Sequence, residues 1–209
     1  MNRGLYLAAA AVAALSLAAC GNGQAEKSAE NASAEAGGQT PAVNAAQDAV
    51  GAAVGSVSAS TLGANTVQGY VSNAAEGDMY EIEAAKIASN KAKSADVKAF
   101  AKMIQTDHTT AMNEMKPLVT AAGQTPPAKL DERRQGMLDN LNAAPADQFD
   151  KVFLTQQVAA HEEALTLHRG YADNGDNAGL KAHAAKVAPK IEAHLTRARE
   201  LAQKTGAAN

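Results

Sequence analysis

From about Val67 onwards, apolar residues recur at intervals of three and four, which is the spacing of amphipathic helices. No segment of the sequence shows the strict alternation that a half-buried strand needs. Ser94 is placed to cap the start of one helix, Gly123 to end it, and Pro189 to kink or break another. The pattern predicts four long helices, over residues 67–90, 94–122, 146–172 and 178–204. It also predicts one short helix over residues 130–141.

The connections between the predicted long helices indicate how they are arranged. Short loops join the first pair and the last pair, whereas a long proline-containing segment separates the two pairs. Short loops place consecutive helices side by side in opposite directions. Aromatic residues make up only 3% of the chain, so its core is built mainly from alanine and aliphatic side chains, which suits close-packed helices. We therefore expect an all-α fold, a four-helix up-down bundle made of two helical hairpins.

Each predicted long helix carries one ionisable residue on its apolar face. These residues are Glu81, His108, His161 and His194. In the second helix, His108 occupies a position on the apolar face where a residue such as leucine is expected. Counting residues from the hairpin loops places Glu81 and His108 at one level of the bundle, and leaves His194 about one turn out of level with His161. A kink at Pro189 would change the position of His194.

Three imidazoles and a carboxylate that converge in a bundle core are typical of a site for one divalent transition metal. This ligand set does not select among Zn, Fe, Cu, Ni and Mn. Three acidic residues near the histidines in sequence, Asp107, Glu162 and Glu163, are expected to fix the orientation of the ligand rings. The alternative is a buried Glu–His network without metal that fixes the register of the helices, because single core histidines commonly hydrogen-bond a neighbour.

The amino-terminal segment has the three parts of a secretory signal. Arg3 is followed by an uncharged apolar stretch and then by Leu-Ala-Ala-Cys, which ends at Cys20. This ending resembles a bacterial lipobox, and the only cysteine of the chain falls at that position. We expect residues 1–19 to be a signal peptide and Cys20 to carry a lipid that anchors the chain in a membrane. By resemblance to the sorting of Gram-negative lipoproteins, Gly21 favours the periplasmic face of the outer membrane.

The segment from Cys20 to residue 65 is rich in Ala, Gly, Ser, Asn and Gln and has no aromatic residue. Such a composition buries little apolar surface, so we expect a disordered tether before a folded domain at 66–209. Four valines lie near helical spacing and make a transient helix a second option, whereas Gly51 and Gly55 are too weak a signal for a packing motif. The four valines are Val43, Val50, Val54 and Val57.

Residues 67–205 resemble the bacterial domain-of-unknown-function 4142 family of envelope proteins. The matching segments are AAEGDMYEIEAAKIA, DVKAFAKMIQTDH, FDKVFLTQQVAAHEEAL and LKAHAAKVAPKIEAHL. The resemblance implies a ferritin-like helical fold and an envelope location, and it implies no known reaction. The chain departs from the family at Ala160, where an acidic residue is usual. His168 and His183 stand where the family tends to have phenylalanine, and we expect them to pack against each other.

A standard di-iron centre would need Glu-x-x-His pairs on two helices. The residues three before the histidines are Gln105, Val158 and Ile191, so the sequence excludes this cofactor. Dispersed basic residues and a net charge of −3 argue against a nucleic-acid partner. No nucleophile elbow or phosphate-binding loop is present in the sequence. We therefore favour a metal-binding envelope lipoprotein over a metal-free interaction module with an unidentified protein partner, and both over an enzyme with an unusual mononuclear site.

Overall fold

In the computed structural model, residues 41–60 and 62–207 are described, and every regular element among them is helical. The all-α prediction is confirmed for this part of the chain. The predicted signal peptide, Cys20 and the first part of the predicted tether lie outside the described residues. The elements are α2 Pro41–Ser60, the short 3-10 helix η1 Leu62–Asn65, α3 Val67–Lys91, α4 Ala95–Ala121, α5 Glu132–Ala143, α6 Phe149–Asn174 and α7 Ala178–Thr205.

Side-chain caps define where most of these helices begin. The side chain of Ser94 accepts a hydrogen bond from the backbone N–H of Val97, so the predicted cap of α4 is confirmed. Corresponding caps start three other helices, at Thr66, Asp131 and Asn177. Gly123 follows α4 with a φ of 67°, a left-handed conformation that glycine adopts without strain, and the helix ends where the sequence predicts.

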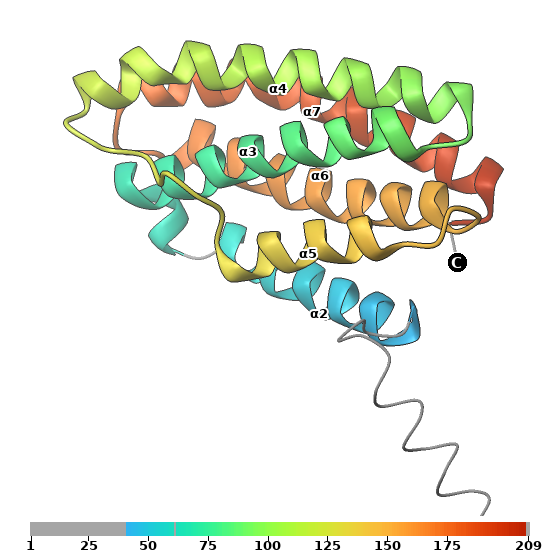
Figure 1. Cartoon of the computed structure of the whole chain (residues 1–209). Helices are drawn as coiled ribbons and strands as arrows, with labels where there is room; N and C mark the ends of the chain where they lie inside the picture. The colour runs from blue at the N-terminus through green and yellow to red at the C-terminus, as the bar shows by residue number, and fades with distance from the viewer. Residues whose placement is uncertain (1–40, 61, 208–209) are drawn as a thin grey trace, which may run out of the picture. The chain divides into compact units, whose positions relative to one another are not determined.

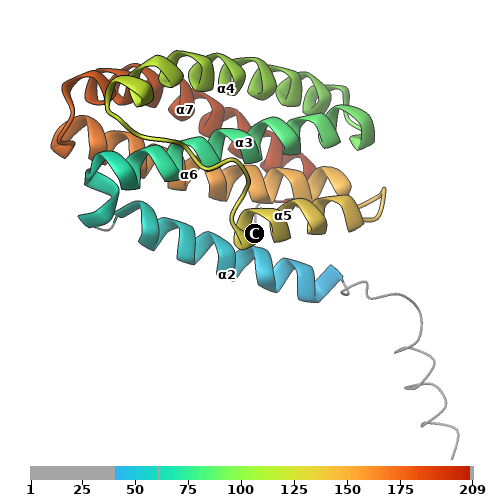
Figure 2. The same cartoon turned by 60° about the vertical axis from the view of Figure 1, so that its left-hand side comes forward.

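The four long helices lie side by side, and their packing follows the predicted hairpins (Figure 1). α3 packs against α4, and α6 packs against α7. Between the hairpins, α3 contacts α6 and α4 contacts α7. The connection between α4 and α5 passes across α3, and α5 then lies beside α3 and α6 (Figures 1 and 2). The predicted short helix near 130–141 is thus confirmed as α5.

Pro189 does not break the last helix. α7 runs without interruption from Ala178 to Thr205 with this proline inside it. Pro189 is exposed at the surface and has no N–H to donate to the carbonyl of Ala185, four residues earlier. Ala185 is exposed as well. Water can therefore satisfy that carbonyl, while Val187 and Ile191 hold the opposite side of the helix in the core.

The described chain contains one helix more than the sequence predicted. Residues 41–60, assigned to a disordered tether, form α2, which packs against α5 and α6. The packed side of α2 contains Asp48, Gly51 and Gly55, whereas the valines Val50, Val54 and Val57 are exposed. The prediction of disorder is wrong over this segment because polar and close backbone contacts hold the helix in place, together with burial of the small apolar side chain of Ala59. No helix among the described residues is long and apolar enough to span a bilayer.

Two apolar cores occupy the ends of the molecule. One is built around Phe149, Phe153, Ile104 and Leu201, and the other around Tyr70, Tyr171, Leu180 and Met115. Between these cores, each long helix contributes buried polar side chains. These side chains are Asp78 and Glu81 from α3, His108 from α4, Gln157 and His161 from α6, and His194 from α7. The fold therefore positions one polar layer at mid-height between two apolar regions.

Candidate metal centre

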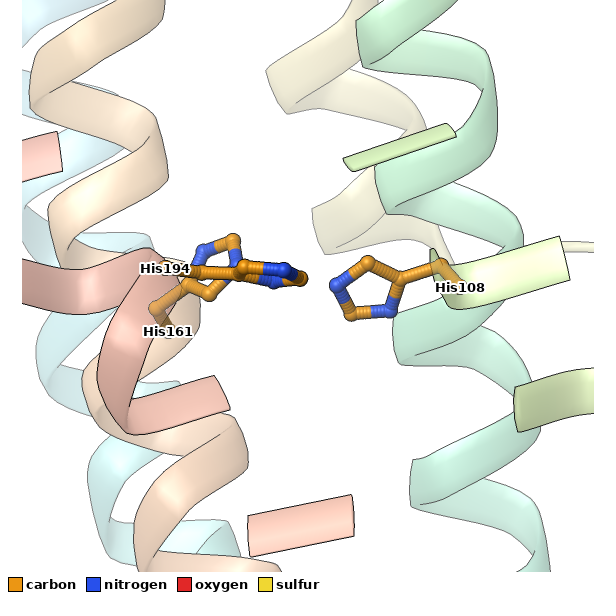
Figure 3. Close-up of side chains that lie close together, drawn as sticks. All are labelled: His108, His161 and His194. Atoms are coloured by element: carbon orange, nitrogen blue, oxygen red, sulfur yellow. The ribbon is translucent and has the colours of Figure 1, made fainter. Parts of the chain in front are cut away.

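Three of the predicted site residues meet in this polar layer. His108, His161 and His194 each offer a ring nitrogen, and these nitrogens all lie within 4.8 Å of one another. The ring centroids are 5.4–5.7 Å apart, and the rings point toward a common space from three different helices (Figure 3). The three residues are 5%, 0% and 3% exposed, so the cluster is buried. We call these three residues the three-histidine cluster.

The helices bring the histidines together through ordinary apolar packing on either side. On α4, His108 lies between Ile104, which belongs to one core, and Met115, which belongs to the other. On α7, His194 follows Ile191 and precedes Ala198 on the buried face. His194 lies at the level of the other two rings, since its ligand nitrogen is within 4.8 Å of theirs. The predicted offset of about one turn is therefore not present.

In each ring of the three-histidine cluster, one nitrogen is hydrogen-bonded to a group outside the cluster. His108 Nδ1 lies 2.8 Å from Asp78 Oδ1, and His194 Nε2 lies 3.0 Å from Asp107 Oδ2. His161 Nδ1 lies 2.9 Å from the backbone carbonyl of Gln157, one turn earlier on α6. Ionised carboxylates and carbonyls only accept hydrogen bonds, so these three nitrogens donate. The protonated nitrogen of each neutral ring is thereby turned away from the cluster.

The remaining nitrogens have no partner. His108 Nε2, His161 Nε2 and His194 Nδ1 are buried and make no hydrogen bond with any of the residues that the structure describes. In a neutral ring, the nitrogen opposite the donor carries a lone pair, which is the form that binds a metal. Leaving a buried polar group unpaired costs about 1–3 kcal/mol. Three such groups that face one another are the arrangement of a metal site, and the donor set fits an ion that prefers nitrogen ligands.

Burial sets the protonation of the three-histidine cluster. Burial lowers the pKa of His161 well below its usual value, and the charges of His108 and His194 act in the same direction. Burial also lowers the pKa of His194, against the opposing effect of Asp107. Burial acts to lower the pKa of His108 as well, but the hydrogen bond and charge of Asp78 raise it above the usual value. A further proton, one that would make a ring cationic, is therefore held most readily by His108.

Glu81, predicted as the fourth ligand, lies beside the cluster but not within it. Its Oε1 is 3.4 Å from His161 Nδ1, the outward nitrogen, and its Oε2 accepts a 2.7 Å hydrogen bond from Gln157 Nε2. The converging ligand atoms come from the three histidines alone. Burial raises the pKa of Glu81 to about 7, although the charge of His108 and the hydrogen bond from Gln157 act to lower it. The structure therefore places Glu81 as a polar neighbour of His161.

The predicted supporting acids have separate outcomes. Asp107 does hold a ring, but the ring belongs to His194 on α7 and not to the adjacent His108. Partial burial acts to raise the pKa of Asp107, but hydrogen bonds from Lys190 and His194 lower it below its usual value. Glu162 holds none of the three rings, because it lies half exposed on α6 and pairs with Arg199 on α7.

Glu163 lies buried away from the cluster. It accepts hydrogen bonds from Arg133 Nη2 at 2.9 Å and from Arg134 Nη2 at 2.6 Å. Arg134 also pairs with Glu76 on α3 and with Asp131 at the start of α5. This charged group connects α5 to α3 and α6, and it has a structural role beneath α2.

Asp78 and Gln157 are site residues that the sequence analysis missed. In the sequence, the apolar face of α3 runs through Val71, Ala74, Glu81 and Ala85, with an interval of seven residues between Ala74 and Glu81. Asp78 fills that gap at the helical interval and is buried at the level of His108. The gap was therefore a usable signal. The sequence contains only a weak indication that Gln157 belongs to the site, namely its position one turn before His161.

His168 and His183 do not form the predicted pair. The ring contact of His168 is with Tyr70 on α3, at 5.5 Å between centroids, and no ring contact joins the two histidines. Burial raises the pKa of Tyr70, so its hydroxyl stays protonated and donates to His168 Nδ1 at 3.0 Å. Tyr70 in turn stacks on Tyr171. His168 is therefore a hydrogen-bonded core residue, separate from the three-histidine cluster.

The fold and the site together define a class: an all-α protein with a buried three-histidine cluster between two apolar cores. The family model described as "Domain of unknown function (DUF4142)" matches residues 52–201, and the chain belongs to this family. The resemblance seen in the sequence is thus confirmed.

One solved structure provides a comparison of the fold. The chain is similar to "CopM in the Cu(II)-bound form", with a TM-score of 0.58 and 21% sequence identity, over 66% of this chain and 97% of that chain. At this level of identity the similarity shows a shared fold. The comparison with curated proteins gave no match.

Proposed function

We propose that the protein binds one divalent transition metal ion through His108 Nε2, His161 Nε2 and His194 Nδ1. The observation that carries this proposal is the set of three buried, unpaired nitrogens that face one another. A metal-free polar network would be expected to use these atoms in hydrogen bonds, because each unpaired buried group is destabilising. Here the hydrogen bonds are made by the outward nitrogens only, so the inward lone pairs remain available to an ion.

Copper is the metal to test first. Among divalent first-row ions, nitrogen sites bind Cu²⁺ most tightly. The similar structure of CopM was obtained with Cu(II) bound, which supports the same choice for this chain. The cluster provides three imidazoles and no bridging carboxylate, so it does not suit two iron ions. Asp78, Asp107 and the Gln157 carbonyl would keep the ligand rings in the metal-binding tautomer.

We further propose a role in the cell envelope, where the protein would store or buffer metal or protect against metal stress. The sequence supports this part of the proposal through the signal-like segment and Cys20, the expected site of a lipid anchor in the outer membrane. In this proposal the four long helices form a ferritin-like up-down bundle that presents the site. Binding, and not catalysis, is the proposed activity, and the protein would have the membrane as its partner.

Metal content tests the proposal. The full chain without a histidine tag is incubated with Cu²⁺, desalted and analysed by mass spectrometry of the metals. We expect close to one copper ion per chain, and loss of that ion in His161→Gln, which removes an inward nitrogen while keeping a polar side chain. His183→Gln is the matched control, because it alters a buried histidine outside the cluster. Equal copper in all three proteins, or none in the parent chain, would contradict the proposal.

A further inference from the structure

A hollow of about 180 Å³ lies between α4 and α7, beside the three-histidine cluster. Its lining includes two of the cluster residues, His108 and His194, which are buried. It also includes solvent-exposed residues, among them Thr110 on α4 and Lys190 on α7. The hollow therefore connects the surface with two of the three proposed ligands.

A second cavity touches the site from the other side but is far smaller. It has a volume of about 30 Å³ and lies against His108, Glu81, Arg133 and Arg134. That volume is about the share of a single water molecule in the liquid, too little for a hydrated metal ion. A third, more open hollow between the same helices reaches His194 but not His108. The hollow that contacts both histidines is therefore the passage that suits an incoming ion.

Two ion pairs cross this hollow from α4 to α7. Lys186 Nζ lies 2.8 Å from both carboxylate oxygens of Glu114, and Lys190 Nζ lies 2.8 Å from Asp107 Oδ1. The other oxygen of Asp107, Oδ2, accepts the hydrogen bond from His194 Nε2. Asp107 thus contacts the surface cation with one oxygen and a proposed ligand ring with the other. Lys190 could leave Oδ1 without disturbing the contact that orients His194.

We propose that the hollow between α4 and α7 is the route by which a hydrated divalent metal ion enters and leaves the three-histidine cluster, and that Lys190 slows this passage by neutralising Asp107. The proposal rests on the proposed metal-binding function and adds the direction of access to it. The carboxylate of Asp107 is the negative group that an ion meets beside His194, and a cation would compete with Lys190 for it. The rate of metal exchange therefore depends on residues that are not ligands.

A pair of adjacent threonines allows a test by steric blocking. Thr110 lines the hollow, whereas Thr109 does not, and both are exposed on α4 with similar side-chain hydrogen bonds to the preceding turn. Stopped-flow fluorescence or absorbance measures Cu²⁺ uptake by the metal-free full chain. We expect uptake to be about tenfold slower in Thr110→Trp and within about twofold of the parent chain in Thr109→Trp. Circular dichroism checks that both variants fold as the parent does.

The charge of Lys190 supplies a second, independent test. We expect Lys190→Gln to take up Cu²⁺ roughly fivefold faster at low salt, and this difference to shrink at high salt as the charges are screened. Lys86→Gln is the control, because it removes the same charge from an exposed position on α3, outside the hollow.

Equilibrium copper content separates the two proposals. If the parent and the variants bind one ion each but Thr110→Trp and Thr109→Trp share the same uptake rate, the access route is wrong and the metal site stands. If Lys190→Gln behaves like Lys86→Gln, the role of Lys190 is wrong. If the parent chain binds no copper, both the metal site and its route are overturned.

Discussion

At the scale of single residues, the site depends on which nitrogen each imidazole presents to the cluster. Asp78, Asp107 and the Gln157 carbonyl can only accept hydrogen bonds, so each directs one ring N–H outward. Of the two acids, Asp78 is the more buried, with a side chain 8% exposed against 25% for Asp107. It also supplies negative charge next to His108.

Replacing Asp78 should weaken metal binding without abolishing it. Asp78→Asn retains an acceptor oxygen for His108 but loses the charge, and partners of this kind contribute about 10- to 100-fold to metal affinity. We expect the affinity for Cu²⁺ to fall by about tenfold at about pH 8, where proton competition is small, with the stoichiometry unchanged. Competitive titration against a chelator measures the change.

Asp139→Asn is the matched control for this measurement. Asp139 is exposed on α5 and accepts a hydrogen bond only from Gln135 among its side-chain neighbours. Its variant should bind Cu²⁺ as the parent does. An Asp78→Asn variant with the affinity of this control would show that Asp78 does not act on the site.

His168 should make the stability of the protein depend on pH. Burial lowers the pKa of His168 to about 3, whereas an unfolded histidine titrates near 6.5. Between these values the unfolded chain binds the extra proton, so the free energy of unfolding falls as the pH falls through this window. His168→Phe removes this contribution. The parent should therefore lose up to about 1.4 kcal/mol per pH unit relative to the variant.

Urea denaturation of the metal-free proteins at several pH values measures this difference. The difference in unfolding free energy at about pH 8 reports the packing of the new ring and the loss of the hydrogen bond with Tyr70, because His168 is neutral in both states there. Only the change of this difference with pH, at pH values below about 8, tests the prediction. Parallel curves for the parent and His168→Phe down to about pH 4 would contradict it.

The individual residues also show which parts of the site could be predicted from the sequence. Helical periodicity correctly brought His108, His161 and His194 to one place, because helix phase determines which side chains face inward. It could not assign the acids. Glu81 has the right phase for a ligand, but its carboxylate is engaged by Gln157 on the outer side of His161. Such choices depend on rotamers and on partners across the core, which periodicity does not encode.

At the scale of elements, α2 is a packed helix that the composition of its segment did not predict. Its exposed face carries the valines, and its packed face carries glycines that let α2 approach α5 and α6 closely. Gly51 contributes its backbone carbonyl to Arg133, and Asp48 accepts hydrogen bonds from Asn140 and Gln156. A composition poor in large apolar residues predicted disorder, because it gives no information on these polar contacts. In contrast, the bounds of α3, α4 and α7 follow closely from capping residues and periodicity.

A single methyl group should test the packing of α2. A Cβ at Gly55 would lie 1.9 Å from Glu163 Oε2, and Glu163 is held in place by Arg133 and Arg134. We expect Gly55→Ala to destabilise the protein by about 1–3 kcal/mol, because the charged group beneath α2 must rearrange. Chemical denaturation followed by circular dichroism gives the value.

Gly136→Ala on α5 is the control for this substitution. A Cβ at Gly136 meets nothing within 4 Å, so only the helix propensity changes. That change should stabilise the protein by about 0.5–1 kcal/mol. Stabilisation of similar size by Gly55→Ala would mean that α2 does not pack as described.

At the scale of the whole molecule, one polar layer lies between two apolar cores, and the chain is expected to continue from α2 toward a lipid anchor. The apolar regions on both sides limit access of water to the layer, so the hollow between α4 and α7 becomes its connection to solvent. The sequence identified the layer through the polar gaps in four apolar stripes. The position of the hollow depends on side-chain packing between α4 and α7, which the sequence alone does not give.

Lipidation of Cys20 is the prediction that belongs to this scale. Cys20→Ala should abolish incorporation of radiolabelled fatty acid and move the protein out of the membrane fraction of the cells that express it, because acyl chains supply the binding to the bilayer. The metal content of this variant should stay unchanged, since Cys20 is not part of the three-histidine cluster. Unaltered membrane fractionation of Cys20→Ala would contradict the proposed anchor.

The central claim is that one metal ion binds among His108, His161 and His194. X-ray diffraction from crystals of the Cu²⁺-loaded protein, measured at the copper absorption edge, locates the ion directly by its anomalous signal. We expect one strong peak between His108 Nε2, His161 Nε2 and His194 Nδ1. Copper peaks found only at surface side chains, with these three nitrogens still without a ligand, would contradict it.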